Sequence, residues 1–317
     1  MINRTLVRTK VIQTLFAYYK AEQMTALGAK KELLKSFSNV YSLYMLLLDF
    51  INEMTTLSEE RIEQECNRAK VLHEPYVAQT NFAHNRLAQQ VFNNRQLRGY
   101  MNETRLSWDV AHESLRLLFK QIAGAEFFTE YQSLPNPTYD DDRQVWRHIF
   151  VDILADNEEL ETALDELEVA LDGSGWSIDA NVVISYVVKT LKRFGPTSNG
   201  DQELLPMFDS EDELTFAKEL LQKAIDGRDE YMELIEKHLK NWELNRIAYM
   251  DIIILQVALA EIIEFPSIAL QVSMNEYLEI AKEYSTDKSY AFINGVLEGA
   301  VNDLKAENKL VKAAALL

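Results

Sequence analysis

The sequence has few of the residues that turns require, with 10 glycines and six prolines among its 317 residues. Strand-rich folds need frequent turns, and turns use glycine and proline, so this scarcity argues against a β-sandwich or a β-barrel. Residues that favour helices, such as Leu, Glu, Ala and Lys, are abundant instead. The composition therefore predicts an all-α fold.

Cysteine is nearly absent, since Cys66 is the single one in the sequence. One cysteine forms neither an internal disulfide nor a cysteine-rich zinc site, which favours the cytoplasm. We expect no signal peptide, because Arg4 and Arg8 interrupt the N-terminal segment. The most apolar run, residues 252–260, is too short to span a bilayer, so no membrane association is expected. These features predict a cytoplasmic protein.

Positive charge is scarce, with 32 Lys and Arg against 50 Asp and Glu, a net charge of −18. This balance argues against a general nucleic-acid coat protein, which must neutralise phosphates. The charge is unevenly spread, because residues 1–35 hold seven basic and two acidic residues, whereas 36–200 hold 14 and 25. A short basic end thus precedes an acidic body.

The basic end coincides with a predicted helix over residues 3–24. Its apolar stripe begins with two cations, because Arg4 and Arg8 fall in line with the apolar face. The apolar positions of that face are Val11, Ile12, Leu15, Phe16 and Tyr19. The two arginines either present guanidinium groups beside a core or lie along apolar surface with their charged ends in water.

Two breaks divide the rest of the chain, at 134–142 with Pro135 and Pro137 and at 195–206 with Gly195, Pro196, Gly200 and Pro206. Before and between them, the apolar spacing predicts helical stretches over 28–56, 58–74, 80–132, 141–155, 157–171 and 180–194, the last capped by Asp179. After the second break it predicts helices over 210–226, 229–242, 246–264, 269–284 and 289–306, with Asp287 or Ser289 as the final cap. The expected buried positions of 80–132 are Phe82, Leu87, Val91, Leu97, Trp108, Leu115, Leu118 and Phe119.

The usual catalytic motifs are missing from the sequence. The five histidines are scattered, no zinc-binding His-Glu-x-x-His occurs, and Asp109-x-x-His112 has no second copy for a di-iron site. The glycines are too dispersed for a phosphate-binding loop. The carboxylates of Glu63 and Glu65 beside Cys66 disfavour the thiolate that a nucleophile needs. We therefore predict no enzyme, no catalytic residue, no metal and no cofactor.

Two positions near the C-terminal end are unusual for a helical core. Gly295 interrupts an apolar helical pattern, where glycine costs roughly 1 kcal/mol relative to alanine, which suggests a close helix approach or a functional demand. Asn275 and Asn294 are polar residues on mostly apolar helices, and if buried they must be hydrogen-bonded. They could hold helices together or serve a binding site.

These segments carry a resemblance to a known family. The stretch from about 210 to 308 resembles the C-terminal part of the NusB transcription antitermination family, and 8–16 resembles the opening helix of that family. The matching pieces are Trp242, the helix Met250 to Glu261, Pro266, Asn275-Glu276, Ala281-Lys282 and Phe292-Ile293-Asn294-Gly295-Val296-Leu297. We expect residues 1–35 and 206–317 to form a NusB-like helical bundle, interrupted by a helical insertion over 36–205.

The resemblance implies a function and its partners. NusB-like proteins bind boxA RNA of ribosomal leaders together with the ribosomal protein NusE, and they keep the RNA polymerase elongation complex from terminating early. No cofactor is implied, and a homodimer stays open. The residues that the resemblance places at the RNA are Arg4, Arg8, Phe16, Asp251, Ser289 and Phe292; those it marks as structural motif residues are Asn275, Glu276, Asn294 and Gly295.

The sequence also departs from the family pattern. Thr5 and Leu6 stand where more basic residues are common, and Lys288 stands where an acidic residue often occurs. Core packing is an alternative for Phe16 and Phe292. One alternative function is an acidic helical protein–protein scaffold that has lost RNA binding; another is the targeting domain of an RNA-modifying enzyme, although we see no methyltransferase domain in the chain.

Overall fold

The computed structural model describes residues 1–21, 23–171, 175–239, 247–286, 288–310 and 312. Its regular elements in these ranges are all helical, apart from one isolated parallel bridge between Ile2 and Phe208, so the predicted all-α class is confirmed. The chain divides into two compact units. We call residues 1–37 with 207–317 the end unit, and residues 38–206 the middle unit.

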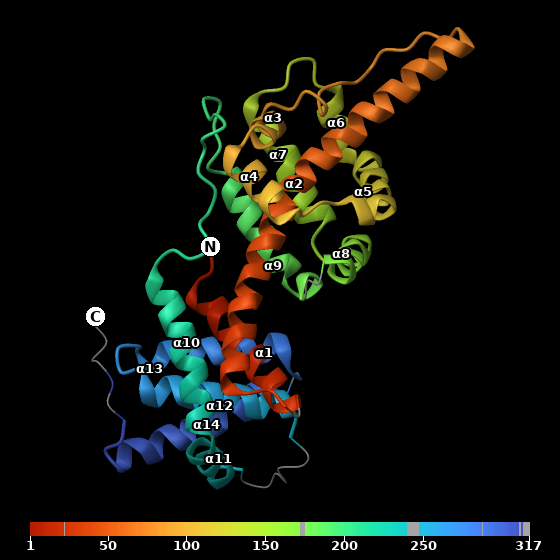
Figure 1. Ribbon diagram of the computed structural model, residues 1–317. Helices are drawn as coiled ribbons and strands as arrows, with labels where there is room; N and C mark the ends of the chain where they lie inside the picture. Colours follow the sequence, from red (N-terminus) through yellow and green to blue (C-terminus); the bar gives the residue numbers. More distant parts are fainter. Residues whose placement is uncertain (22, 172–174, 240–246, 287, 311, 313–317) are drawn as a thin grey trace. The chain divides into compact units, whose positions relative to one another are not determined.

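The end unit is built around α12, whose residues 251–262 are all buried. A helix that is apolar all round belongs inside a core, and α12 contacts α1, α10, α11, α13 and α14 (Figure 1). The helices of this unit are α1 (Arg4–Lys20), the start of α2 (Ala26–Leu72), α10 (Glu211–Asp226), α11 (Arg228–Lys237), α12 (Tyr249–Glu264), α13 (Leu270–Tyr284) and α14 (Ser289–Ala306).

One long helix, α2, replaces the two predicted helical stretches over 28–56 and 58–74. It begins after Thr25, whose hydroxyl accepts a hydrogen bond from the amide of Gly28 at 3.0 Å, and ends before His73, which has a φ of 58°. Neither glycine nor proline occurs between Gly28 and Pro75, so nothing interrupts the 47-residue helix, drawn in red to orange in Figure 1.

The middle unit contains shorter helices than the sequence predicted for 80–132. Asn85 and Asn94 interrupt that stretch, because their side chains accept hydrogen bonds from the amides of Ala88 and Leu97, each at 3.0 Å, and so start new helices. The elements are α3 (Arg86–Phe92), α4 (Arg95–Thr104), η1 (Asp109–Ala111), α5 (His112–Gly124), α6 (Glu126–Ser133), α7 (Tyr139–His148), the π-helical turn η2 (Ile149–Ile153), α8 (Glu158–Leu171) and α9 (Trp176–Leu191).

Aromatic side chains fill the core of the middle unit. Trp108, Trp146 and Trp176 are buried, and two of their indole nitrogens donate to carbonyls of α2: Trp108 to Leu46 at 3.1 Å and Trp176 to Asn39 at 2.9 Å. A buried indole N–H usually finds an acceptor, but that of Trp146 has none among the described residues. All eight positions predicted as buried in 80–132 are buried, so that part of the interpretation is confirmed.

Helix starts were predicted less well than helix cores. Asp179 is not a cap but a buried residue in the first turn of α9, which follows Gly175 at a φ of 76°. The first break does end in a cap, where Thr138 and Asp141 bond each other's backbone amides at the start of α7. Asp287 and Trp242, which the sequence analysis singled out, lie outside the described residues.

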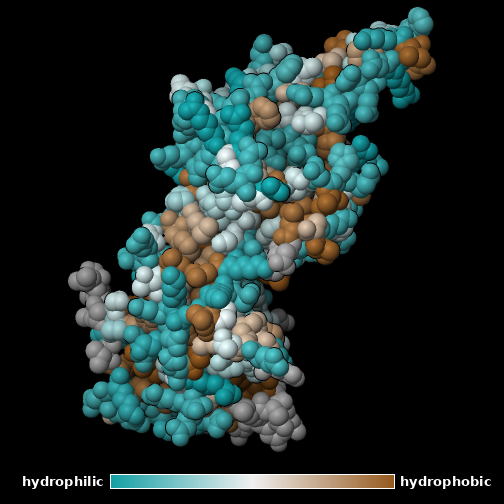
Figure 2. Space-filling model, viewed as in Figure 1, coloured by the Kyte–Doolittle hydropathy of each residue, from teal (hydrophilic) through white to brown (hydrophobic). Residues whose placement is uncertain are grey.

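The surface visible in Figure 2 is mostly hydrophilic on both units. A hydrophobic patch is seen at the far end of α2, where Val71 and Leu72 are 76% and 50% exposed. Within the described ranges, no helix has both the length and the apolar character needed to cross a membrane.

Candidate functional site

Arg8 lies inside the end unit and is 2% exposed. Its Nε donates to Glu261 Oε2 at 2.8 Å, one Nη donates to Glu261 Oε1 at 2.9 Å, and the other donates to Glu276 Oε2 at 3.2 Å. Burial lowers the pKa of the Arg8 guanidinium, but the hydrogen bonds and charge of Glu261 outweigh burial and raise it. Arg8 therefore joins α1 to α12 and α13 as a buried cation, which does not fit direct contact with a phosphate.

Glu261 is the acceptor at the centre of this network and is fully buried. Besides Arg8, it accepts hydrogen bonds from Ser273 Oγ at 2.7 Å and Tyr277 Oη at 2.9 Å. Burial, followed by the charge of Glu261, raises the pKa of Tyr277, so the tyrosine keeps its proton and donates. Two hydroxyls and a two-pronged guanidinium satisfy this carboxylate, as a buried charge requires.

Arg4 lies one turn before Arg8 but is exposed. Its guanidinium carbon lies 5.0 Å from the ring centroid of Phe216, a buried residue of α10, and this cation–π contact holds the side chain against the helix. Between the two arginines, Thr5 Oγ1 donates to Glu276 Oε2 at 2.8 Å. Of the two arginines in the predicted stripe, only Arg4 presents its charge to solvent.

Asp251 and Ser289 meet at the start of α14. Ser289 Oγ donates to Asp251 Oδ2 at 2.9 Å, and Ser285 Oγ bonds the other carboxylate oxygen. The amide of Thr286 donates to Ser289 Oγ at 3.2 Å. Both predicted site residues are buried, at 5% and 1% exposure, and they fix the turn between α13 and α14 onto the first turn of α12.

Phe16 belongs to a small aromatic and cationic cluster. Its ring centroid lies 5.5 Å from that of Tyr249 in an edge-to-face arrangement, and Lys20 Nζ lies 5.7 Å from Phe16 and 4.7 Å from Tyr249. Phe16 is half-buried, whereas Tyr249 is 39% exposed. An exposed ring beside an ammonium group suits stacking on a planar, electron-rich ligand.

The last helix carries Phe292, Asn294 and Gly295. Phe292 is half-buried and lies one turn after Ser289. Asn294 Nδ2 donates to Glu298 Oε1 at 3.0 Å, within its own helix. Gly295 is exposed, with no atom within 4 Å of the position that a Cβ would take, whereas a Cβ at Gly299 would lie 2.4 Å from His238 Nδ1. The close approach expected at Gly295 is therefore made one turn later, at Gly299.

Of the adjacent residues Asn275 and Glu276, one connects two helices and the other does not. Asn275 is exposed and accepts a hydrogen bond from Gln271 within α13 at 3.1 Å, so neither asparagine holds two helices together through these bonds. Glu276 does, because it accepts from both Thr5 and Arg8 of α1.

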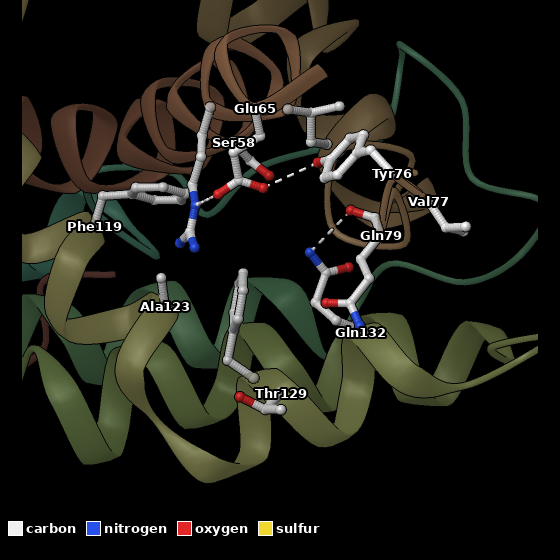
Figure 3. A pocket seen from close by; sticks show the side chains of 12 residues that line it. Ser58, Glu65, Tyr76, Val77, Gln79, Phe119, Ala123, Thr129 and Gln132 are labelled. Atoms are coloured by element: carbon white, nitrogen blue, oxygen red, sulfur yellow. Dashed lines mark hydrogen bonds and ion pairs between the residues drawn. The ribbon is translucent and has the colours of Figure 1, made fainter. Parts of the chain in front are cut away.

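A cavity in the middle unit has a volume of about 280 Å³ (Figure 3). Arg61 Nε donates to Glu65 Oε1 at 2.8 Å, and Tyr76 Oη donates to the other oxygen at 3.0 Å. The hydrogen bond from Arg61, before that from Tyr76, lowers the pKa of Glu65. The one carboxylate of this cavity is thus a satisfied anion, which is unsuited to take up a proton near neutral pH.

The predicted site residues therefore form two groups. Buried Arg8 with half-buried Glu276, and buried Asp251 with buried Ser289, are pairs that join helices. Arg4, Phe16 and Phe292, in contrast, reach the surface. Helices α12 and α13 each contact both α1 and α14, which brings the two ends of the chain into one body. Sequence reasoning missed Glu261, Tyr249 and Lys20. The partners of Glu261 and the Phe16 partner of Tyr249 lie on other helices, where periodicity gives no signal. Lys20 lies four residues after Phe16 and could have been found from helical spacing.

Comparisons with known protein sequences point to one family. A sequence model described as the NusB family matches residues 185–302, a range that begins within α9. Transcription antitermination protein NusB of Salinibacter ruber is 35% identical over 132 residues, which is 40% of this chain and 82% of that protein. The NusB proteins of Bacillus licheniformis and Finegoldia magna are 37% and 43% identical over 31% and 28% of this chain, and 75% and 64% of their own lengths.

No solved structure matches the chain. The sequence matches include the segment from Tyr249 to Val301 that holds the acceptors of the Arg8 and Ser289 hydrogen bonds. The chain belongs to the NusB family.

Proposed function

We propose that this protein is a transcription antitermination factor that binds boxA-like RNA together with the ribosomal protein NusE. In this proposal, the complex keeps RNA polymerase elongating, notably on ribosomal RNA operons, and acts in the cytoplasm by binding and not by catalysis. The names of its relatives, which are transcription antitermination proteins, support the proposal.

The observation that carries the proposal is the placement of exposed Arg4 and half-buried Phe16 and Phe292 on α1 and α14 of one unit. Single-stranded RNA is held by cations on its phosphates and by aromatic faces under its bases. Arg4 supplies a charge, and the cluster of Phe16, Lys20 and Tyr249 supplies exposed ring surface beside a second charge. We propose that these residues and Phe292 contact RNA.

The remaining predicted site residues act as positioning residues in this proposal. Arg8 and Glu276 hold α1 on α12 and α13, and Asp251 and Ser289 hold the start of α14 on α12. Interactions this well buried fix the angle at which α1 and α14 present their exposed side chains. We further propose that residues 1–35 and 206–317 are the NusB domain and that 36–205 are an insertion in it.

One observation favours the acidic scaffold as a second candidate. Burial of Arg8 between two carboxylates removes one of the two cations expected at the RNA, in a chain with a net charge of −18. A protein with few phosphate contacts binds RNA weakly unless a partner contributes. The scaffold predicts that Arg4→Ala and Phe292→Ala leave binding to NusE unchanged and that no RNA binds.

The test is a fluorescence-anisotropy titration of boxA-like RNA with this protein, with NusE, and with both. We expect the pair to bind more tightly than either protein alone. Phe292→Ala should weaken binding by roughly tenfold, since one base stack is worth about 1–3 kcal/mol. Arg4→Ala should lower the slope of log affinity against log salt by about 0.7, the value for one single-strand phosphate contact.

Matched controls remove an exposed ring or charge elsewhere. Phe92→Ala in α3, where Phe92 is 58% exposed, and Lys305→Ala at the end of α14 should change neither the affinity nor the salt dependence. Equal affinity of the pair and of the separate proteins for the RNA would contradict the proposed function.

A further inference from the structure

A groove between α7 and α9 of the middle unit is basic, although that unit is strongly acidic. Residues 38–206 contain 14 Lys and Arg against 27 Asp and Glu. Five of the 14 cations lie on the last two turns of these two helices or directly after them: Arg143, Arg147, Lys189, Lys192 and Arg193. Such a concentration creates a local positive potential inside an acidic surrounding.

The groove itself has a volume of about 230 Å³ and is lined by cations without an acidic residue. Arg143, Gln144 and Arg147 line it from α7, and Val188, Leu191 and Lys192 line it from α9. Leu191 is 2% exposed and, with Val188, forms an apolar floor. The groove therefore combines charge at its walls with an apolar base.

Most of this charge is uncompensated. Arg143 pairs with Asp140 in the preceding turn of its own helix, but Arg147 and Lys192 form no ion pair with any described residue. Arg147 lies four residues after Arg143, so both guanidinium groups leave the same face of α7. Two unneutralised cations facing one groove repel each other, and an anion between them relieves that repulsion.

We propose that the α7–α9 groove binds phosphate groups of a single-stranded RNA, as an anchoring point separate from the surface on α1 and α14. Guanidinium groups match phosphate oxygens in a two-pronged geometry, and Lys192 adds a point charge. The side-chain amide of Gln144 can bond a base edge, and Val188 and Leu191 offer an apolar face for a base. The inference rests on the proposed function, since it takes RNA as the ligand.

The location in the middle unit makes the inference specific. The α9 side of the groove lies within the NusB match over 185–302, whereas α7 lies before that match, and neither side belongs to the helices α1 and α14. We infer that the groove contacts RNA beyond the boxA-like segment. The net charge of the middle unit repels nucleic acid at long range, so contact should depend on these few cations and be sensitive to salt.

The experiment compares a boxA-like RNA with the same RNA extended by single-stranded tails, each titrated over a range of salt concentrations in the presence of NusE. The variant R147E/K192E reverses the two unpaired charges of the groove. We expect it to bind the extended RNA about tenfold more weakly, with a salt slope lower by about 1.4, the value for two phosphate contacts. Its affinity for the short RNA should equal that of the wild type.

The control K70E/K120E makes the same change of charge on exposed residues of α2 and α5 that form no ion pair with the described residues. Its affinity for the extended RNA should stay near that of the wild type. All four side chains are exposed, so circular dichroism and melting temperature should match the wild type, and photo-crosslinking of 4-thiouridine in the tails should label peptides of α7 and α9.

Several results would overturn the inference. One is an equal loss of affinity in both variants, which would mean general charge repulsion. Another is an unchanged affinity of R147E/K192E for extended RNA together with weaker NusE binding, which would assign the groove to a protein. Failure of NusE to strengthen binding of the short RNA, with groove-dependent binding of the tails intact, would contradict the proposed function and leave this inference standing.

Discussion

The end unit and the middle unit differ in whether their buried and half-buried charges have partners of opposite charge. In the end unit, the buried carboxylate of Glu261 is matched by a buried cation and two hydroxyls, with Arg8 contributed from 253 residues away in sequence. In the middle unit, the half-buried carboxylate of Glu53 has no hydrogen-bonding or ion-pairing partner among the described residues, and Arg147 and Lys192 are unpaired as well. A buried charge destabilises the fold strongly if it loses its partner, whereas an unpaired charge either costs stability or serves binding.

The largest expected effect comes from breaking the pair in the end unit. Arg8→Met leaves Glu261 buried and uncompensated, so we expect the free energy of unfolding to fall by about 3–5 kcal/mol. Urea unfolding measures the loss, and hydrogen exchange on α1 and α12 assigns it to the end unit. Adding Glu261→Gln should restore part of the stability.

The matched control is Arg4→Ala, because Arg4 is exposed on the same helix. It should change the stability by less than about 1 kcal/mol. If the two arginine variants lost similar amounts, the description of Arg8 as the buried connection between helices would be wrong.

The second effect concerns two glycines of α14, one turn apart. A Cβ at Gly299 meets the ring of His238, which bonds Asp303 through Nε2 at 2.8 Å, so Gly299→Ala should destabilise the end unit by about 1–3 kcal/mol. Gly295→Ala faces open space and should be neutral or stabilising by up to about 1 kcal/mol. Thermal melting of both variants measures the difference.

Gly295→Ala also tests whether that position serves binding. A variant that is stable but binds RNA or NusE more weakly would assign Gly295 to a contact surface. A Gly299→Ala variant as stable as the wild type would show that His238 moves aside, against the close approach described above.

The smallest expected effect lies in the middle unit. Burial, followed by the charges of Asp49, Asp109 and Glu60, raises the pKa of Glu53 from its usual value near 4.5 to about 7. The folded state therefore binds the proton more tightly than the unfolded state, and stability falls as the pH rises from about 4.5 to 7. Glu53→Gln should then stabilise the protein by about 1–2 kcal/mol at pH 8, after allowance for partial exposure, and have little effect near pH 4.

Urea unfolding at both pH values measures this dependence. Glu59→Gln, an exposed residue on the same helix, is the control and should have little effect at either pH. A Glu53→Gln variant with the same gain at both pH values would contradict the raised pKa.

Much of the fold could be read from the sequence, because apolar spacing reports burial directly. The predicted helices over 210–226, 269–284 and 289–306 lie within one residue of α10, α13 and α14. The helices of 80–132 were not separated, because the apolar pattern continues across Asn85 and Asn94 while these side chains restart the backbone hydrogen bonding. A helix cap depends on a single side chain in one particular geometry. The apolar periodicity is a property of many residues, so it does not show where such a cap lies.

The candidate site was predictable in its members but not in their roles. Arg4 and Arg8 are alike in the sequence, being two arginines one turn apart in the same stripe, yet one is exposed and the other is 2% exposed. Similarly, the resemblance placed Ser289 at the RNA, and the structure shows it buried, with its Oγ 2.9 Å from Asp251 Oδ2. Exposure depends on which helices cover each position.

The sequence by itself determined that the protein is all-α, which positions of 80–132 are buried, and that its two ends resemble one family. The helical class and the buried positions follow from the helix propensities of the residues and from the 3.6-residue spacing of apolar side chains. Both can be read from the order of residues along the chain. The tertiary structure alone decided which charges are paired. Arg8 forms ion pairs with Glu261 and Glu276, whereas Arg147 and Lys192 form none with the described residues. The reason is that the electrostatic energy of a pair depends on the distance between its charges in space, and helices that are close in space can be remote in sequence.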